Sequence, residues 1–313
     1  QPPNINLFMQ SQPFSHRPGH SIAWGTVPHP FDPHGPSNPA AVYRYEKELP
    51  KPCVHPVTTP TGRVLTGFEP SDHSWHRGLW FTIKFVNEEN FWEESAPFGT
   101  QENVVEPSVE QIDEQGCVVR HRLAWVRPNA ETVLREERTL RMEHRGDAIA
   151  FDWSTSLTPQ RDVVLDRTPY TTWGGYGGLT FRITREMHDV RCLTPEGHTR
   201  EPPKGQNHPW LGIDGRLDGG PRVYAGVAMF DHPHNPRWPS PFYAKMQSGV
   251  TYMNASLLFH EPMTLDQAQT LALRYRVLVK DGQWRGEELA TESQQFTQTK
   301  AEASASTHAA ATT

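Results

Sequence analysis

The residues of this chain that are best suited to chemistry gather in the stretch SDHSWHRGLW, residues 71–80. Two histidines, His73 and His76, lie three residues apart, and Arg77 follows the second directly. Imidazoles titrate near neutral pH, whereas a guanidinium is a fixed cation that binds oxyanions. Three interpretations are therefore open: the histidines bind a metal ion, they move protons on a polar substrate, or they are purely structural.

A metal site would need ligands from outside this stretch. Zinc enzymes commonly use three His, Asp or Glu ligands and leave one position open. His55, His73 and His76 are a candidate set, but neither an HExxH motif nor a local two-His, one-carboxylate spacing is present. The pair at i and i+3 shares a face only on a helix. We therefore expect no cofactor, and the alternative is a divalent metal bound by these three histidines.

Acid–base chemistry uses the same residues more fully. His73 or His76 is the expected general acid or base. Glu93 follows two bulky aromatic residues, where burial would raise the pKa of its carboxyl group, so it is the expected proton donor. Arg77 and Arg182 offer fixed cations for substrate oxygens or a developing oxyanion.

The residues expected to bind substrate come from several polar stretches along the chain. They are Lys51, His55, Asp72, Trp75, Arg77, Trp80, Trp92, Tyr176, Arg182, His232 and Asn235. The three tryptophans are expected to wall a cleft, because flat aromatic rings stack on sugars. The Gly-rich run GGYGG around Tyr176 lacks GxxxxGK[ST] and a following helix, so it predicts a tight turn rather than a phosphate-binding loop.

Composition restricts the partners. The 313 residues carry a net charge of −6 and are 35% hydrophobic, which argues against disorder and against a basic nucleic-acid surface. No apolar run approaches the roughly 20 residues that a membrane helix needs. The expected partner is a small carbohydrate, with no nucleic acid and no membrane, and a homodimer is possible. Cys53, Cys117 and Cys192 are few and widely spaced, which predicts free thiols in a reducing cytoplasm.

Alternating apolar and polar residues predict an all-β chain with few short helices. The expected strands are 41–49, 63–68, 79–86, 117–126, 131–143, 148–157, 179–184, 222–230, 254–259 and 270–280, followed by a short helix within 281–296. Strands in series without helices between them favour one large antiparallel sandwich. We expect an irregular arm over 1–39, a single β-sandwich domain over 40–296 and a flexible tail over 297–313.

The order of motifs resembles a large bacterial family that carries the label methane oxygenase PmoA. The motifs are KPxxHP with TPxG, DHxxHRGLWF, NFWEE, GGLTFR and FDHPxNPRWP, and they extend from about Glu46 to Gly282. The resemblance implies a role in carbohydrate catabolism and a supersandwich similar to that of galactose mutarotases. It does not imply methane oxidation, since membrane-spanning segments and an obvious copper site are missing. The family positions matched here are Lys51, His55, His73, His76, Arg77, Glu93, Arg182, His232 and Asn235.

These observations favour a carbohydrate-active enzyme. His and Glu would exchange protons at the anomeric carbon or beside a carbonyl, in glycoside cleavage, elimination or epimerisation. The alternatives are a lyase or hydrolase that uses a metal-binding His cluster, and a non-catalytic sugar-binding module.

Overall fold

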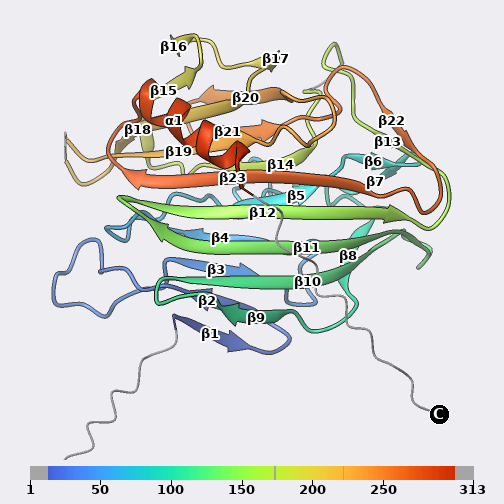
Figure 1. The fold of residues 1–313 in the computed structure, drawn as a ribbon, viewed down its shortest axis with the longest axis horizontal. Helices are drawn as coiled ribbons and strands as arrows, with labels where there is room; N and C mark the ends of the chain where they lie inside the picture. Colours follow the sequence, from blue (N-terminus) through green and yellow to red (C-terminus); the bar gives the residue numbers. More distant parts are fainter. Residues whose placement is uncertain (1–12, 173, 221, 300–313) are drawn as a thin grey trace, which may run out of the picture.

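The computed structural model describes residues 13–172, 174–220 and 222–299. In this part of the chain two large antiparallel sheets face each other, and a small third sheet lies at one end of them (Figure 1). The predicted all-β class and the antiparallel sandwich are confirmed. None of the described residues belongs to a helix that could span a lipid bilayer.

The first sheet is built from segments that are far apart in the sequence. In order across the sheet, its nine strands are β1 (Phe14–Arg17), β2 (Ser21–Trp24), β3 (Ala41–Arg44), β4 (Cys53–Val57), β5 (Leu79–Thr82), β14 (Gly178–Arg182), β21 (Val250–Ala255), β20 (Pro241–Gln247) and β17 (Lys204–Asn207). The centre of the sheet therefore brings β5, β14 and β21 side by side.

The second sheet contains the longest strands. Its order is β16 (Gly197–Thr199), β15 (Met187–Thr194), β18 (Trp210–Leu217), β19 (Tyr224–Asp231), β23 (Leu271–Asp281), β12 (Ala148–Pro159), β11 (Thr132–Arg145), β10 (Gly116–Val126) and β8 (Thr100–Asn103), with β9 (Ser108–Gln111) also paired to β10. Alternation along β11 buries Leu140 and Met142 and exposes Arg135 and Glu137, as the sequence predicts.

The remaining elements lie outside the two large sheets. The third sheet has the order β22 (Met263–Leu265), β13 (Val163–Asp166), β6 (Phe85–Val86) and β7 (Glu89–Asn90). Helix α1 (Gly286–Thr297) confirms the predicted short helix and lies across the outer face of the second sheet (Figure 1). Its Leu289 and Phe296 pack against Trp210, Phe230 and Leu278 of that sheet.

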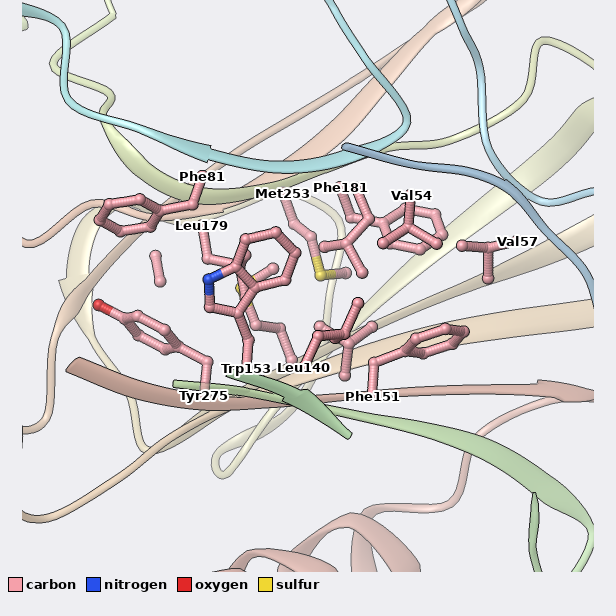
Figure 2. Close-up of a cluster of buried hydrophobic side chains, with 14 of the residues drawn as sticks. Val54, Val57, Phe81, Leu140, Phe151, Trp153, Leu179, Phe181, Met253 and Tyr275 are labelled. Carbon is pink, nitrogen blue, oxygen red and sulfur yellow. The ribbon is translucent and has the colours of Figure 1, made fainter. Parts of the chain in front are cut away.

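The main core fills the space between the two large sheets. Figure 2 shows apolar side chains of both sheets in this core, among them Val54, Phe81, Phe181, Met253, Leu140, Phe151, Trp153 and Tyr275. Each large apolar side chain that is buried in this way contributes roughly 1.5–3 kcal/mol to folding. One face of the first sheet is thereby fixed against the core, and its other face is available for a site.

The sequence locates the long strands well and the short ones poorly. Predicted strands that match observed ones closely are 117–126, 131–143, 148–157, 179–184, 222–230 and 270–280. The predicted strand 63–68 is wrong, since it contributes only isolated bridges. The predicted 41–49 ends at Arg44, 79–86 is divided into β5 and β6, and 254–259 is mostly a turn after β21. Strands such as β18 escape prediction because two glycines interrupt their apolar pattern.

The predicted N-terminal arm is also wrong in part. Residues 14–24 form a hairpin, β1 and β2, that extends the edge of the first sheet. Residues 1–12 and 300–313, which include most of the predicted tail, lie outside the described residues. Cys53, Cys117 and Cys192 are buried and free, in agreement with the prediction of free thiols.

Candidate functional site

Most of the predicted site residues gather on the outer face of the first sheet, which points away from the main core. Successive side chains of a strand alternate between its two faces. Phe181 and Met253 lie in the main core, so their neighbours Arg182 and Tyr252 point outward. The register places Arg182, Tyr252 and Lys245 next to one another on β14, β21 and β20. This row of polar side chains is the floor of the site.

A loop over residues 67–78 carries the two histidines across this floor. The backbone of Arg182 holds both ends of the loop: its carbonyl oxygen accepts from Gly67 N at 2.9 Å, and its N–H donates to Gly78 O at 2.8 Å. Gly78 has a φ of 76°, and a Cβ atom there would lie 2.6 Å from the carbonyl oxygen of Val54. Only glycine fits such a close approach at positive φ, which explains the glycine of the HRGLW motif.

Asp72 and His73 form a hydrogen-bonded pair on this loop. His73 Nδ1 donates to Asp72 Oδ2 at 2.5 Å, which leaves Nε2 available to accept a proton. Arg182 donates to both oxygens of Asp72 at 2.9 and 3.2 Å, and Arg185 donates to one of them. Burial raises the pKa of Asp72, but the hydrogen bonds from His73, Arg185 and Arg182 outweigh it and lower the pKa. Asp72 is therefore an ionised carboxylate that orients the imidazole of His73.

His76 lies between His73 and the sheet and is only 2% exposed. Its ring stacks on that of His73 with 4.6 Å between the ring centroids. Burial, followed by the nearby charge of Arg182, lowers the pKa of His76 well below its usual value, so the ring is neutral. Arg182 donates from Nη1 to His76 Nδ1 at 3.2 Å. His76 therefore supports His73 from below, whereas the side chain of His73 is 20% exposed.

Glu94, which is not among the predicted site residues, joins two of the predicted cations. Lys51 Nζ donates to Glu94 and to the carbonyl oxygen of Trp92, both at 2.8 Å. Arg77 donates to the same carboxylate and also to Glu69. Burial raises the pKa of Glu94, but the charges of Lys51 and Arg77 outweigh it and lower the pKa. Lys51 and Arg77 are almost fully buried, so they hold the loop in place and have no free charge for a substrate.

Glu93, the predicted proton donor, is already engaged inside the protein. It forms an ion pair with Lys84, and the Tyr176 hydroxyl donates to it at 3.4 Å. The side chain of Glu93 is thus held by Lys84 and Tyr176, and a catalytic role for it stays a prediction.

The predicted tryptophan walls are present only in part. Trp80 and Trp92 are 0% and 1% exposed, so they cannot touch a bound sugar and instead pack beneath His76. Trp75 is half-buried, and its ring lies edge-on to His73 at 5.4 Å. Only this third tryptophan can face a ligand. The GGYGG stretch is irregular chain that leads into β14 rather than an assigned turn, and its four glycines have positive φ.

A pocket of about 310 Å³ opens beside His73, above β20 and β21. Its aromatic and charged lining consists of His73, Tyr170, Lys204, Tyr243, Lys245 and Tyr252. Of these, only His73 is a predicted site residue. The missed signal is the alternation Tyr243, Ala244, Lys245 in the stretch PFYAKMQ, which forms β20. Burial raises the pKa of Tyr252 well above its usual value, so its phenol stays protonated.

His55 lies on the same face but contacts Thr66 and Phe68 rather than the other two histidines. Its Nδ1 lies 2.8 Å from Thr66 Oγ1, and its ring stacks on Phe68 at 4.8 Å. Burial and then the charge of Arg44 lower the pKa of His55 to about 4. Within residues 13–172, 174–220 and 222–299, no three His, Cys, Asp or Glu side chains are placed to share a metal ion. His55, His73 and His76 therefore do not form the three-ligand set of the metal alternative.

His232 and Asn235 are predicted substrate-binding residues, but they lie on the other side of the molecule. His232 follows β19 of the second sheet, and its ring lies 5.1 Å from that of Phe296 in α1. Asn235 donates to the carbonyl oxygen of Arg274 at 2.8 Å and is 4% exposed. Their placement in the same site as His73 is wrong, because outward-pointing residues at this end of β19 face the helix.

The fold and the pocket together define a class: an antiparallel β-sandwich with a polar, aromatic-lined pocket on the outer face of one sheet. The chain belongs to the family of unknown function DUF6807, whose model matches residues 36–294. This family takes the place of the predicted one, and the methane oxygenase label has no support. No curated protein matches the sequence.

Several solved structures are similar to this chain. One is the alpha-galactosidase from Lactobacillus brevis, with 8% identity, a TM-score of 0.41 and coverage of 77% of this chain and 38% of that one. Another is the galactosidase domain of the alpha-galactosidase-sucrose kinase AgaSK, with 11% identity and a TM-score of 0.38. The match covers 84% of this chain and 41% of that one. A third is a galactose mutarotase-related enzyme from Lactobacillus acidophilus, with 7% identity and a TM-score of 0.38. The match covers 86% of this chain and 97% of that one. The chain spans less than half the length of the two galactosidases. Similarity at this level says nothing of the activity of this chain.

Proposed function

We propose that this protein is an enzyme that acts on a small carbohydrate by acid–base chemistry, with His73 as the group that moves the proton. The observation that carries the proposal is the Asp72–His73 pair, which lies beside the pocket, where no described residue forms a hydrogen bond with Nε2 of His73. A general base must lie within hydrogen-bond reach of its substrate, and His73 is the histidine of the loop that lines the pocket.

The pocket suits a sugar in size and chemistry. Its volume of about 310 Å³ is at the small end of the roughly 300–1,000 Å³ that small-ligand sites occupy. Tyr170 and Tyr243 supply flat rings for an apolar sugar face and hydroxyl groups for its oxygens, and Tyr252, which is 4% exposed, lies in the floor of the pocket. Because the phenol of Tyr252 stays protonated, it is a donor for a carbonyl or ring oxygen that gains negative charge.

In the proposed reaction, Nε2 of His73 takes a proton from the anomeric hydroxyl or from the carbon beside a carbonyl. The imidazole becomes an imidazolium, and the ionised Asp72 stabilises this charge through Nδ1. Tyr252 donates a hydrogen bond to the oxygen that gains negative charge. The imidazolium then returns its proton to the rearranged sugar or to the leaving group. His76 stays neutral, so it adds no repulsion against the charge that forms on His73.

The test is to incubate the protein in D₂O with a panel of aldoses, sugar acids, keto-sugars and glycosides. Proton NMR then follows anomer exchange, deuterium incorporation beside carbonyls and glycoside cleavage. We expect turnover of at least one compound, with most of the activity lost in His73→Gln. His121→Gln is a matched control, because His121 is a buried histidine that bonds to Tyr43 in the interior. A wild-type protein inert on the whole panel, or an active His73→Gln, would refute the proposal.

A non-catalytic sugar-binding module is the second candidate. The observation that favours it is the pocket lining, where Tyr170 and Tyr243 supply neutral donors and stacking surfaces. Calorimetric binding of a sugar that the wild-type protein never converts, with unchanged affinity in His73→Gln, would establish this candidate in place of the enzyme.

A further inference from the structure

We propose that the substrate is an anionic sugar, a monosaccharide that carries a carboxylate or phosphate group, and that Lys204 and Lys245 bind this group. The inference rests on the proposed function, because it places the anion in the same pocket as His73. It is carried by the two lysines that line the pocket and by the state of every other charge in the site.

Lys204 and Lys245 are the cations of the pocket with no charged partner. Among the described residues no carboxylate forms an ion pair with either lysine. Lys204 pairs across strands with Tyr243, and Lys245 pairs with Tyr252, so each lysine lies next to a tyrosine on the outer face. The body of Lys245 is half-buried. Two such lysines beside one pocket favour an anionic ligand.

The rest of the site cannot neutralise these lysines, because its carboxylates are already paired. Around the loop, five cations share four carboxylates: Lys51, Arg77, Lys84, Arg182 and Arg185 with Glu69, Asp72, Glu93 and Glu94. Every carboxylate of this group therefore contacts at least one cation inside the protein. The two pocket lysines increase an existing excess of positive charge, and a neutral sugar would leave that excess uncompensated.

The position of the anion follows from the strand register. Arg182, Tyr252 and Lys245 follow one another across β14, β21 and β20. Arg182 holds Asp72, and thus orients His73, at one end of this row. Lys245 lies at the other end. A sugar that spans Tyr252 would present its reacting carbon to His73 and its charged group to Lys245, with Lys204 at the rim of the pocket.

The experiment measures binding by titration calorimetry at low ionic strength. The anionic probes are D-glucuronate, D-galacturonate and D-glucose 6-phosphate, and their neutral counterparts are D-glucose and D-galactose. We expect at least one anionic probe to bind ten-fold or more tightly than its neutral counterpart, and this preference to shrink as salt is added. A preference for the uronates identifies the carboxylate, and a preference for glucose 6-phosphate identifies the phosphate.

Variants assign the preference to the lysines. Lys245→Met is expected to weaken binding of the preferred anion at least ten-fold, and Lys204→Met to weaken it less, because Lys204 is more exposed. Lys245→Arg keeps the positive charge and should bind the preferred anion with most of the wild-type affinity. This result would show that the loss in Lys245→Met comes from the missing charge rather than from misfolding. Lys47→Met, at an exposed lysine in the turn after β3, is the matched control.

The possible failures separate this inference from the proposed function. Equal binding of neutral and anionic probes, or full affinity for the anion in both lysine variants, overturns the anionic substrate. If neutral sugars are then converted with dependence on His73, the proposed function survives alone. If no sugar of either kind binds or reacts, both proposals fail.

Discussion

The outer faces of the two large sheets carry the same pair of side chains in different surroundings. On the first sheet Arg182 donates to His76 at 3.2 Å, and on the second sheet Arg274 donates to His232 at 3.1 Å. Both histidines are at most 2% exposed, and burial lowers the pKa of each. Considered alone, the two pairs are chemically alike.

What covers the two pairs is different. Above His76 the loop places His73 and Asp72, and a pocket opens beside them. Above His232 lies Phe296 of α1, and Arg274 also donates hydrogen bonds to the carbonyl and hydroxyl oxygens of Thr299. The buried His–Arg pair therefore has a structural role on both sheets. The first sheet gains a candidate site only because a second, reachable imidazole is stacked on the first.

The largest expected difference between the two faces is in activity. His73→Gln removes the proposed base and should lower kcat/KM by about 10²- to 10⁴-fold. His232→Gln should leave kcat/KM within about two-fold, because a glutamine oxygen can still accept from Arg274. Steady-state kinetics on the substrate identified by NMR measures both values. Similar losses in the two variants would mean that the faces do not differ in function.

A smaller difference is expected in stability. Arg182→Met leaves Asp72 and His76 without their buried partner, and should lower the free energy of unfolding by about 3 kcal/mol. Arg274→Met removes hydrogen bonds to neutral groups only, so we expect a loss of about 1–2 kcal/mol. Urea unfolding at pH 7 measures both. A larger loss in Arg274→Met would show that the charge of Asp72 does not depend on Arg182.

In pH dependence the two faces should behave alike. His76 and His232 are neutral in the folded protein because their pKa values are lowered, that of His232 to about 4. In the unfolded chain each takes up a proton below a pKa of about 6.5. Stability should therefore fall as pH drops from about 6.5 toward 4, by up to about 1.4 kcal/mol per pH unit for each histidine.

Replacing either histidine by glutamine should reduce the slope of the unfolding free energy against pH by the equivalent of about one proton. Urea midpoints between pH 7 and pH 4.5 measure this slope. Asp72 adds a separate loss only at lower pH, because a carboxyl group with a depressed pKa stabilises the fold above its unfolded value of about 3.9. A histidine variant that keeps the full slope would contradict the assignment of a neutral ring at that position.

The sequence predicts what is encoded locally. Alternation reveals the long strands, and the motif around His73 and Arg77 marks the loop that carries the site. Strand register and stacking depend on segments that are distant in the sequence, so they are not visible in the motif. For that reason the motif alone cannot show that His76 is buried and His73 reachable, and it groups His232 with a site on the opposite face.

The same limit explains the missed pocket residues. Tyr243 and Lys245 alternate along a strand that begins with a proline and has few strongly apolar residues. They become significant only when the register places them beside Tyr252 and Arg182. The buried cations are predicted site residues, but they do not line the pocket. Lys51 and Arg77 are residue types that often bind anionic ligands, but both form ion pairs with the carboxylate of Glu94 inside the protein.

The hold that Arg182 has on the loop bears on the order in which the site is assembled. Its backbone fastens both ends of the loop, and its side chain fixes Asp72, which precedes it by 110 positions. A chain that has been synthesised only as far as the HRGLW motif already contains both histidines, but nothing yet orients them. The proposed base comes into being when β14 docks beside β5, so partly folded molecules and N-terminal fragments would carry the motif without its chemistry.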